Sequence, residues 1–244
     1  MKQQILTITE NTPVTASVYR MRLEGADLEQ QKPGGFVNIR LNGLFLRRPI
    51  SVYDSVPGSL TILYKVVGKG TEQMAGIKAG EPLDVLTGLG NGYDLSKAGE
   101  APLLLGGGVG VPPLYLLAKQ LAAAGKRVSA VLGFNTAEEV FGEEAFKALG
   151  CKVTVTTADG SCGTKGFVTD ALPDDYSYFY TCGPEPMLRA VYRTAKTSGQ
   201  FSFEERMGCG FGACMGCSRR TITGYKRICR EGPVLEKEEI LCFD

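Results

Sequence analysis

The sequence predicts a β + α/β protein in three parts: an antiparallel β-barrel, a doubly wound domain with a parallel sheet, and a small cysteine-rich module. Three observations support this division. Residues 1–98 contain short alternating strands, residues 99–200 alternate strands with helices, and residues 201–244 carry closely spaced cysteines. We expect these three ranges to be the domains.

The barrel is expected from six short strands separated by turn-forming residues. Tyr19, Met21 and Leu23 alternate with Arg20 and Arg22, which is the period of a half-buried strand. The predicted strands are 4–9, 18–23, 36–41, 50–53, 60–67 and 83–85, with one short helix over 71–75. Such a set of strands without a long helix is typical of a small antiparallel barrel.

After residue 99 the pattern changes to strands alternating with helices, which indicates a parallel, doubly wound sheet. The first strand leads into a glycine-rich turn, and the helix after it places Leu114, Leu117, Ala118 and Leu121 on one face. The predicted strands are 103–105, 128–134, 152–156 and 178–181, and the predicted helices are 112–124, 137–149, 167–171 and 185–197.

Composition excludes several classes of function. The 244 residues include no histidine, so a Ser-His-Asp triad, a Cys-His dyad and a His-ligated metal are ruled out. The net charge of +1 gives no reason to expect nucleic acid or an anionic membrane as a partner. The most apolar window, 102–124, is interrupted by glycines and prolines, so we expect no membrane span. Because the start does not resemble a secretory signal, we expect a cytoplasmic protein with reduced or metal-bound cysteines.

The C-terminal cysteines carry the strongest functional signal. Cys209, Cys214 and Cys217 stand in the order C-x4-C-x2-C, and Cys229 follows them. Plant-type ferredoxins hold a [2Fe–2S] cluster with four thiolates at this spacing. We therefore expect these four cysteines to bind such a cluster and the chain to transfer electrons. Three further cysteines fit no ligand spacing and are interpreted as structural: Cys151, Cys162 and Cys242.

Two loops of the parallel-sheet domain suggest nucleotide binding. The turn GGGVGVPP over 106–113 is typical of a pyrophosphate loop, although Val111 replaces the last glycine of G-x-G-x-x-G. Cys182-Gly183-Pro184 follow a later strand, and ligands of open parallel sheets bind at the carboxyl ends of strands. The two loops should therefore face one crevice. Both also have structural explanations, since glycine turns pack helices on sheets and cysteine is a common buried residue.

Three pieces of the barrel sequence could bind a dinucleotide. Arg48 precedes Pro49-Ile50-Ser51, and arginine suits bidentate pairing with phosphate. The segment 68–71 (GKGT) opens the short helix, where backbone N–H groups can hold an anion. The glycine-rich turn 88–92 ends the barrel. Singly they could be an exposed arginine pair, a helix cap and a linker, but their occurrence ahead of a nucleotide-type domain favours a flavin site.

Together these segments resemble the ferredoxin-NADP reductase superfamily over essentially the whole chain. The resemblance implies an FAD site at an R-x-Y-S-like segment and two later pieces of the barrel: Arg48, Pro49, Ile50, Ser51, Leu63, Tyr64, Lys65, Gly70 and Thr71. It implies an NAD site at two loops: Gly106, Gly107, Gly108, Gly110, Cys182, Gly183 and Pro184. Ile50 departs from the pattern, because many members carry an aromatic residue there.

The segment EERMGCGFGACMGCSRR and the later CREGPV closely resemble the electron-transfer subunit of class B dihydroorotate dehydrogenase. The resemblance implies a chain that carries FAD and a [2Fe–2S] cluster. Such a chain passes electrons between NADH and an FMN-containing catalytic subunit that oxidises dihydroorotate in pyrimidine (UMP) biosynthesis. A heterotetramer with two copies of each subunit is expected. Hydride transfer needs no protein acid or base, so no catalytic residue is expected in this chain.

NADH rather than NADPH is expected from the loop after the second strand of the parallel sheet. This loop, GFNTAEE over 133–139, offers Glu138 and Glu139 and no arginine or lysine. Carboxylates repel a 2′-phosphate and can bind a ribose hydroxyl.

Two alternatives remain open at this point. The chain could be the small subunit of an NAD(P)H–ferredoxin oxidoreductase or of a sulfide dehydrogenase-like complex. The four cysteines could instead bind zinc in an interaction module, although such sites usually use two short Cys pairs, and only Cys214 and Cys217 form one. Phe211 and Met215 would suit partner docking if exposed, or local packing if not. Nearby arginines could offset the charge of a cluster or simply be solvated: Arg206, Arg219 and Arg220.

Overall fold

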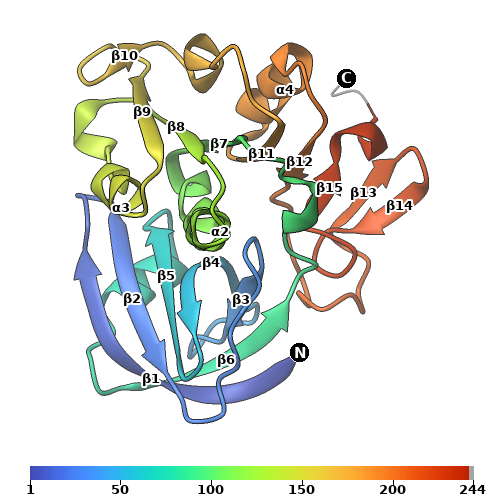
Figure 1. Ribbon diagram of the computed structural model, residues 1–244. Coiled ribbons are helices and arrows are strands. Elements are labelled where there is room, and N and C mark those ends of the chain that lie inside the picture. The colour runs from blue at the N-terminus through green and yellow to red at the C-terminus, as the bar shows by residue number, and fades with distance from the viewer. Residues whose placement is uncertain (242–244) are drawn as a thin grey trace.

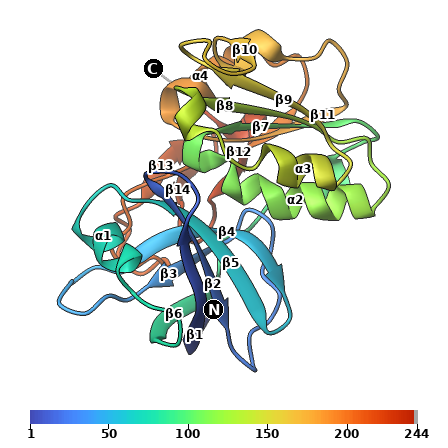
Figure 2. The same ribbon diagram turned by 90° about the vertical axis from the view of Figure 1, so that its left-hand side faces the viewer.

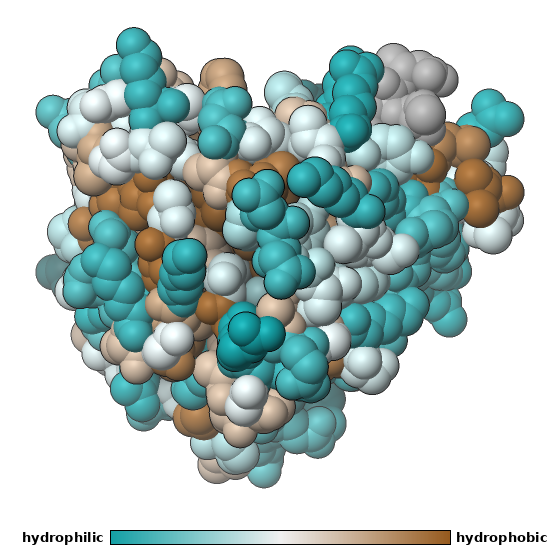
Figure 3. All heavy atoms as spheres, turned by 45° about the horizontal axis from the view of Figure 1, so that its top comes forward, coloured by the Kyte–Doolittle hydropathy of each residue, from teal (hydrophilic) through white to brown (hydrophobic). Residues whose placement is uncertain are grey.

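The computed structural model describes residues 1–241 and has the predicted architecture: an N-terminal barrel, a parallel-sheet domain and a C-terminal module beside both (Figure 1). The interpretation of Cys242 as structural concerns a residue outside the described range. Among residues 1–241, no helix is long and apolar enough to cross a membrane. Seen obliquely from above, the molecule has hydrophilic side chains interspersed with apolar patches (Figure 3).

The barrel is closed by six antiparallel strands in the order β1-β2-β5-β4-β3-β6. Its strands are β1 (Lys2–Pro13), β2 (Val18–Glu24), β3 (Phe36–Ile39), β4 (Arg48–Val56), β5 (Ser59–Lys65) and β6 (Pro82–Leu89), with helix α1 (Lys69–Ala75) between the last two. Successive residues of β3 point to opposite sides of the barrel wall. Val37 and Ile39 fill the barrel core, whereas Phe36 packs outside it, against the other two parts of the chain. The expected barrel is therefore confirmed.

The second sheet has the order β10-β9-β8-β7-β11-β12-β15 and is parallel except at its last strand. Its strands are β7 (Pro102–Gly107), β8 (Ser129–Phe134), β9 (Lys152–Thr157), β10 (Thr164–Lys165), β11 (Tyr178–Cys182), β12 (Gly199–Ser202) and β15 (Val234–Glu236). Helices α2 (Pro112–Ala123) and α3 (Glu143–Ala148) cover the face toward the barrel, and α4 (Glu185–Thr194) covers the other (Figure 2). Leu104 packs on the first face and Leu103 and Leu105 on the second, as expected for a doubly wound sheet.

Three of the predicted helices differ from those found. The range 137–149 contains a 3-10 turn (Ala137–Glu139) and then α3, because the extended Val140 ends the turn and Gly142, with a left-handed φ of 84°, precedes the helix. The range 167–171 is a single 3-10 turn, Val168–Ala171. Helix α4 stops at Thr194, before the predicted 197. The predicted apolar face of α2 is confirmed, since Leu114, Leu117, Ala118 and Leu121 are all buried.

Helix α2 joins the barrel to the parallel sheet. Its Leu116 enters the barrel core, and its Tyr115 stacks on Tyr53 of β4 with ring centroids 4.2 Å apart. Lys119 forms an ion pair with Asp54 of the same strand, with Nζ 2.9 Å from Oδ2. These contacts place the carboxyl ends of β7 and β11 beside the barrel.

The C-terminal module is a long insertion between β12 and β15, two paired strands of the second sheet. It contains the hairpin β13 (Ser218–Thr221) and β14 (Gly224–Arg227), and it returns through β15, which pairs antiparallel with β12. The expected boundary at 200/201 falls within β12.

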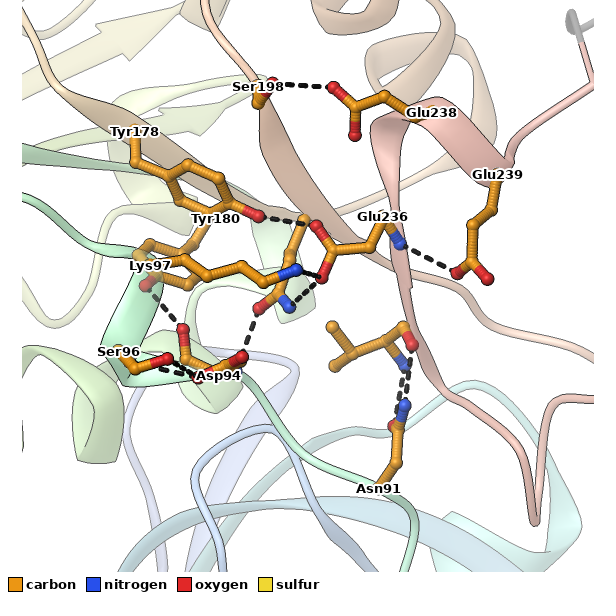
Figure 4. A network of polar contacts seen from close by, with 12 residues as sticks. Asn91, Asp94, Ser96, Lys97, Tyr178, Tyr180, Ser198, Glu236, Glu238 and Glu239 are labelled. Atoms are coloured by element: carbon orange, nitrogen blue, oxygen red, sulfur yellow. Dashed lines mark hydrogen bonds and ion pairs between the residues drawn. The ribbon is translucent and has the colours of Figure 1, made fainter.

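Polar contacts fix the return strand β15 (Figure 4). The Glu236 carboxylate accepts hydrogen bonds from Lys97, Tyr178 and Gln200, each at 2.7 Å. Although partial burial alone raises the pKa of Glu236, these donors outweigh it and lower the pKa below its usual value.

Candidate functional site

The segment expected to bind flavin pyrophosphate begins β4. Arg48 lies against the first turn of α1, because a Cβ added to Gly70 would lie 2.1 Å from the Arg48 Nε atom. The segment that begins at Arg48 and the segment that contains Gly70, two of the predicted pieces of the FAD site, are thus in contact. Arg47 is held differently, with Nη1 bonded to Asp84 Oδ1 at 2.9 Å. Arg48 donates one N–H to the Leu46 carbonyl at 2.5 Å and forms no ion pair within residues 1–241, so of the two arginines it is the one available to a phosphate.

Thr71 and Tyr64 use their side chains within the fold. The Thr71 hydroxyl accepts hydrogen bonds from the N–H groups of Val67 and Gly68 at 2.9 and 3.3 Å, so it caps α1 from within. The Tyr64 ring lies in the barrel core, where its hydroxyl donates to Asn11 Oδ1 at 2.9 Å. Burial raises the pKa of Tyr64 to about 12. Contacts of these residues to FAD would therefore use their backbone.

Leu63 and Lys65 face the neighbouring domain. Leu63 joins the hydrophobic core shared with α2. Lys65 forms an ion pair with Glu139 of the loop after β8, with Nζ 3.2 Å from Oε1. Glu139 also accepts bonds from the backbone and side-chain nitrogens of Asn135 at 3.2 and 2.8 Å. Of the two carboxylates expected to select NADH, Glu139 is therefore held by Lys65 and Asn135, whereas Glu138 is exposed.

The two loops expected to bind NAD meet at one edge of the sheet, as predicted. Cys182 at the end of β11 is the β-pairing partner of Gly106 at the end of β7. A Cβ on Gly110 would lie 2.2 Å from the Cys182 carbonyl oxygen, and one on Gly107 would lie 2.4 Å from the Met187 sulfur. The close approach of the loops therefore requires glycine at position 110, where the facing atoms are backbone, whereas the Met187 side chain facing Gly107 is flexible.

Cys182 is half-buried at this edge of the sheet and packs against the hydrophobic core. Burial raises its pKa to about 12, although a hydrogen bond with Ser202 acts in the opposite direction. The thiol is thus neutral near pH 7, and it is neither a base nor an anion. Tyr93, from the glycine-rich turn region after the barrel, donates to the Thr181 carbonyl at 3.1 Å and so supports the end of β11.

The four cluster cysteines form two pairs. Cys209 and Cys214 approach each other at the surface, where the Cys209 N–H donates to the Cys214 sulfur at 3.4 Å. Cys217 and Cys229 are buried, and the Cys229 N–H donates to the Cys217 sulfur at 3.4 Å. Within residues 1–241, no three His, Cys, Asp or Glu side chains are grouped closely enough to hold a single metal ion. Two thiol pairs suit a binuclear cluster, in which each iron takes two thiolates.

Backbone N–H groups surround the pair at the surface, Cys209 and Cys214, which we call the outer pair. The Cys209 sulfur accepts from Ala213 at 3.2 Å and from Cys214 at 3.4 Å. Burial alone raises the pKa of Cys209, but the surrounding backbone donors outweigh it and lower the pKa to about 6. By contrast, burial and the neighbouring Cys217 raise the pKa of Cys229 to about 12. The donor set, four sulfurs with N–H groups directed at them, fits a thiolate-bound iron–sulfur cluster.

Three residues that sequence reasoning did not identify hold this loop. Arg227 donates to the Gly212 carbonyl at 2.6 Å and pairs with Glu231. Asn91 donates to the carbonyls of Glu231 and Val234 and accepts from the Val234 N–H. Asn38 of β3 donates to the Cys209 carbonyl at 3.2 Å. Only Asn91 had a signal in the sequence, as the polar residue within a glycine-rich turn.

The arginines near the cysteines differ in their contacts and exposure. Arg219 lies 4.1 Å above the Phe203 ring centroid and pairs with Glu205 at 2.9 Å. Arg220 is exposed. Phe211 and Met215 are 42% and 54% exposed, so the apolar side chains of the cluster loop are accessible to a partner.

A barrel with an arginine beside α1, a parallel sheet with two adjoining loops at the carboxyl ends of β7 and β11, and a four-cysteine loop define a pyridine-nucleotide reductase with an iron–sulfur module. Comparisons with known proteins agree. Residues 204–241 match the iron–sulfur cluster binding domain of dihydroorotate dehydrogenase B, and residues 104–193 match the oxidoreductase NAD-binding domain.

Relatives extend the match to the full length. The chain is 43% identical to the dihydroorotate dehydrogenase B (NAD(+)) electron transfer subunit of Fusobacterium nucleatum subsp. nucleatum, with 96% of both chains covered. It is also 43% identical to the corresponding subunit of Shouchella clausii, with 98% of both covered. The chain therefore belongs to the family of dihydroorotate dehydrogenase B electron transfer subunits.

A solved structure is similar over nearly the same extent. It is described as an NADH-dependent reduced ferredoxin-NADP oxidoreductase, studied for flavin-based electron bifurcation. The TM-score is 0.88 at 30% identity, covering 98% of this chain and 90% of that one. A ferredoxin reductase of carbazole 1,9a-dioxygenase, with a TM-score of 0.68 at 20% identity, shares the fold over 79% of this chain and 64% of that one.

Proposed function

We propose that this chain passes electrons between NADH and the FMN of a dihydroorotate dehydrogenase catalytic subunit, through FAD and a [2Fe–2S] cluster, in pyrimidine (UMP) biosynthesis. The observation that carries this proposal is the pairing of four cysteine thiols on a loop that touches the barrel at Asn38. The names of the full-length relatives support it.

Each cofactor has a proposed set of residues. FAD would be held by Arg48, Pro49, Ile50, Ser51, Leu63, Tyr64, Lys65, Gly70 and Thr71. NAD would be held by Gly106, Gly107, Gly108, Gly110, Cys182, Gly183 and Pro184. The cluster would be held by Cys209, Cys214, Cys217 and Cys229. The proposed functional units are residues 1–98 for FAD, 99–200 for NAD and 201–244 for the cluster, with the last beginning inside β12.

FAD supplies the conversion between a two-electron hydride and single electrons, which an iron–sulfur cluster carries one at a time. The chain's own residues bind and orient. Arg48 would neutralise a phosphate, and the close approach of Gly110 to Cys182 shapes the crevice for the nicotinamide. The neutral Cys182 thiol adds no charge beside the hydride path. Proton abstraction from dihydroorotate would belong to the partner.

NADH is the proposed nucleotide. The exposed Glu138 is the carboxylate that remains for a ribose hydroxyl, because Glu139 is held by Asn135 and Lys65. A strong preference for NADPH in steady-state kinetics would contradict this proposal.

The proposed partner is an FMN-containing dihydroorotate dehydrogenase subunit, in a heterotetramer with two copies of each chain. Exposure of Phe211 and Met215 beside the outer cysteine pair supports a docking surface there. A cytoplasmic location is proposed because thiolate cluster ligands require reduced cysteines.

Co-expression with a candidate catalytic subunit tests the proposal. The complex should reduce NAD when given dihydroorotate, and substitution of Cys209 by serine should abolish this activity together with the iron–sulfur absorption. A complex that forms and retains both flavins but does not couple dihydroorotate to NAD would contradict it.

A second candidate is the small subunit of an NADH-dependent ferredoxin oxidoreductase, which is favoured by the solved structure at TM-score 0.88. Its test is reduction of ferredoxin by NADH or NADPH in a complex with a larger flavin and [4Fe–4S] subunit. The higher identity of the dihydroorotate dehydrogenase subunits, 43% against 30%, favours the first candidate.

A further inference from the structure

Asn38 stands at the contact between the barrel and the cluster loop. Its side chain is 1% exposed and, like Phe36 two residues earlier, leaves β3 away from the barrel core. The side-chain nitrogen Nδ2 donates to the Cys209 carbonyl at 3.2 Å. Since a carbonyl can only accept, the amide orientation follows from this contact.

The cluster loop is shaped to receive this amide. Gly210 follows Cys209 with a φ of 77°, and a Cβ at this position would lie 2.1 Å from Asn38 Nδ2. On the barrel side, Asn38 is the β-pairing partner of Pro49, within the segment proposed to bind FAD. One side chain therefore contacts the first cluster cysteine and belongs to the strand beside the flavin segment.

The remaining oxygen of the amide argues against a purely structural role. Asn38 Oδ1 is buried and has no hydrogen-bond partner among residues 1–241. A buried acceptor without a partner lowers stability, and an apolar residue of the same size would avoid this loss. Asn91, which holds the other end of the module, uses both atoms of its amide. Within residues 1–241, the contact that the Asn38 amide makes is therefore the one from its nitrogen to the cluster loop.

We propose that Asn38 is a positioning residue for electron transfer, which fixes the Cys209 end of the cluster loop against the FAD-binding strand. The proposal rests on the ligand and FAD assignments above. Electron transfer between two bound groups falls steeply with their separation, so a loop released from β3 transfers electrons more slowly. The amide dipole also directs its positive end toward the loop, which favours the more negative, reduced cluster.

Asn38→Asp removes the donor at nearly constant volume and tests the proposal in the full chain purified with its cofactors. Asn42→Asp, a few residues away at an exposed position, makes the same charge change without a contact to the loop. After anaerobic mixing with NADH, flavin reduction in Asn38→Asp should match the control. Cluster reduction should be slower, the cluster potential should shift to more negative values, and the electron paramagnetic resonance signal should shift.

A second variant approaches the contact from the loop. Gly210→Ala should slow cluster reduction, because its Cβ displaces the amide and because an alanine is strained at a φ of 77°. The Asn38→Ala substitution removes the amide that the Cβ of Gly210→Ala would meet. Cluster reduction in the double variant should therefore be slowed by less than the sum of the effects of Asn38→Ala and Gly210→Ala alone. Additive effects would overturn the proposal.

Two further results would overturn it. One is an Asn38→Asp protein with the resonance signal, cluster potential and cluster reduction rate of Asn42→Asp. The other is loss of FAD and cluster together, which would make Asn38 a folding residue. Failure of the ligand assignment is seen separately, as a cluster that survives Cys209→Ser in the wild-type background.

Discussion

Replacement of Gly110 by alanine should separate the two loops proposed to bind NAD. The new Cβ would lie 2.2 Å from the Cys182 carbonyl oxygen and 2.4 Å from its carbonyl carbon. These are backbone atoms of a strand end, so no side-chain rotation relieves the clash. An ordinary contact of 3.4 Å requires the loops to move apart by about 1.2 Å.

This displacement is large enough to measure. A misplacement of about 1 Å between reacting groups can lower a rate on the order of 100-fold, so FAD reduction by NADH should slow by up to that factor. Overpacking should also lower the free energy of unfolding by about 1–3 kcal/mol. FAD content and the cluster spectrum should stay unchanged, because Gly110 is not among the residues proposed to bind FAD or the cluster.

Gly125→Ala is the matched control for lost stability. Gly125 has a φ of 75° and no atom within 4 Å of an added Cβ, so alanine there costs about 1–2 kcal/mol from backbone strain alone. Stopped-flow reduction by NADH compares the two variants. If Gly110→Ala reduces its flavin as fast as Gly125→Ala, the two loops do not form the nicotinamide crevice and the assignment is wrong.

Three other predictions concern the cysteines, the barrel and β15. Serine at Cys151 or Cys162 should leave the visible iron–sulfur spectrum intact, whereas serine at any proposed ligand should bleach it. Tyr64→Phe should cost about 1 kcal/mol in urea unfolding, through the lost bond to Asn11, and should retain FAD; loss of FAD would show that the phenol itself binds the flavin. The pKa of Glu236 is depressed from its ordinary 4.5, so its contribution to stability is present above that pH and lost as pH falls below it. In Glu236→Gln, the free energy of unfolding should therefore fall less steeply as the pH is lowered than in the unsubstituted protein. An equally steep fall would contradict the role given to this carboxylate.

Much of the architecture is readable from local patterns. Period-2 alternation predicts the barrel strands, and alternating strands and helices predict the parallel sheet, because each reflects which face of an element is buried. The cysteine spacing predicts the metal ligands for a similar reason. Three cysteines within nine residues, followed by a fourth twelve residues later, match the four-thiolate spacing of a [2Fe–2S] site.

The features that sequence reasoning missed are those set by distant contacts. β15 is only three residues long and exists because β12 offers it an edge, so it has no periodic signal of its own. The predicted helix over 137–149 is interrupted at residues 140–142, where Val140 is extended and Gly142 has a left-handed φ. Asn38 looks like an ordinary strand residue until the cluster loop, 171 residues later, is placed against it.

The pairing of β12 with β15 has a further consequence. Ser202 and Val234 are partners across this antiparallel pair, so the chain leaves and re-enters the nucleotide sheet at neighbouring points. Topologically, everything between them is an insert whose two ends are already adjacent. A short turn joining these strands would leave the order of the six preceding strands of that sheet intact. The iron–sulfur part is therefore inserted as one unit between two strands of a sheet whose other pairings do not depend on it.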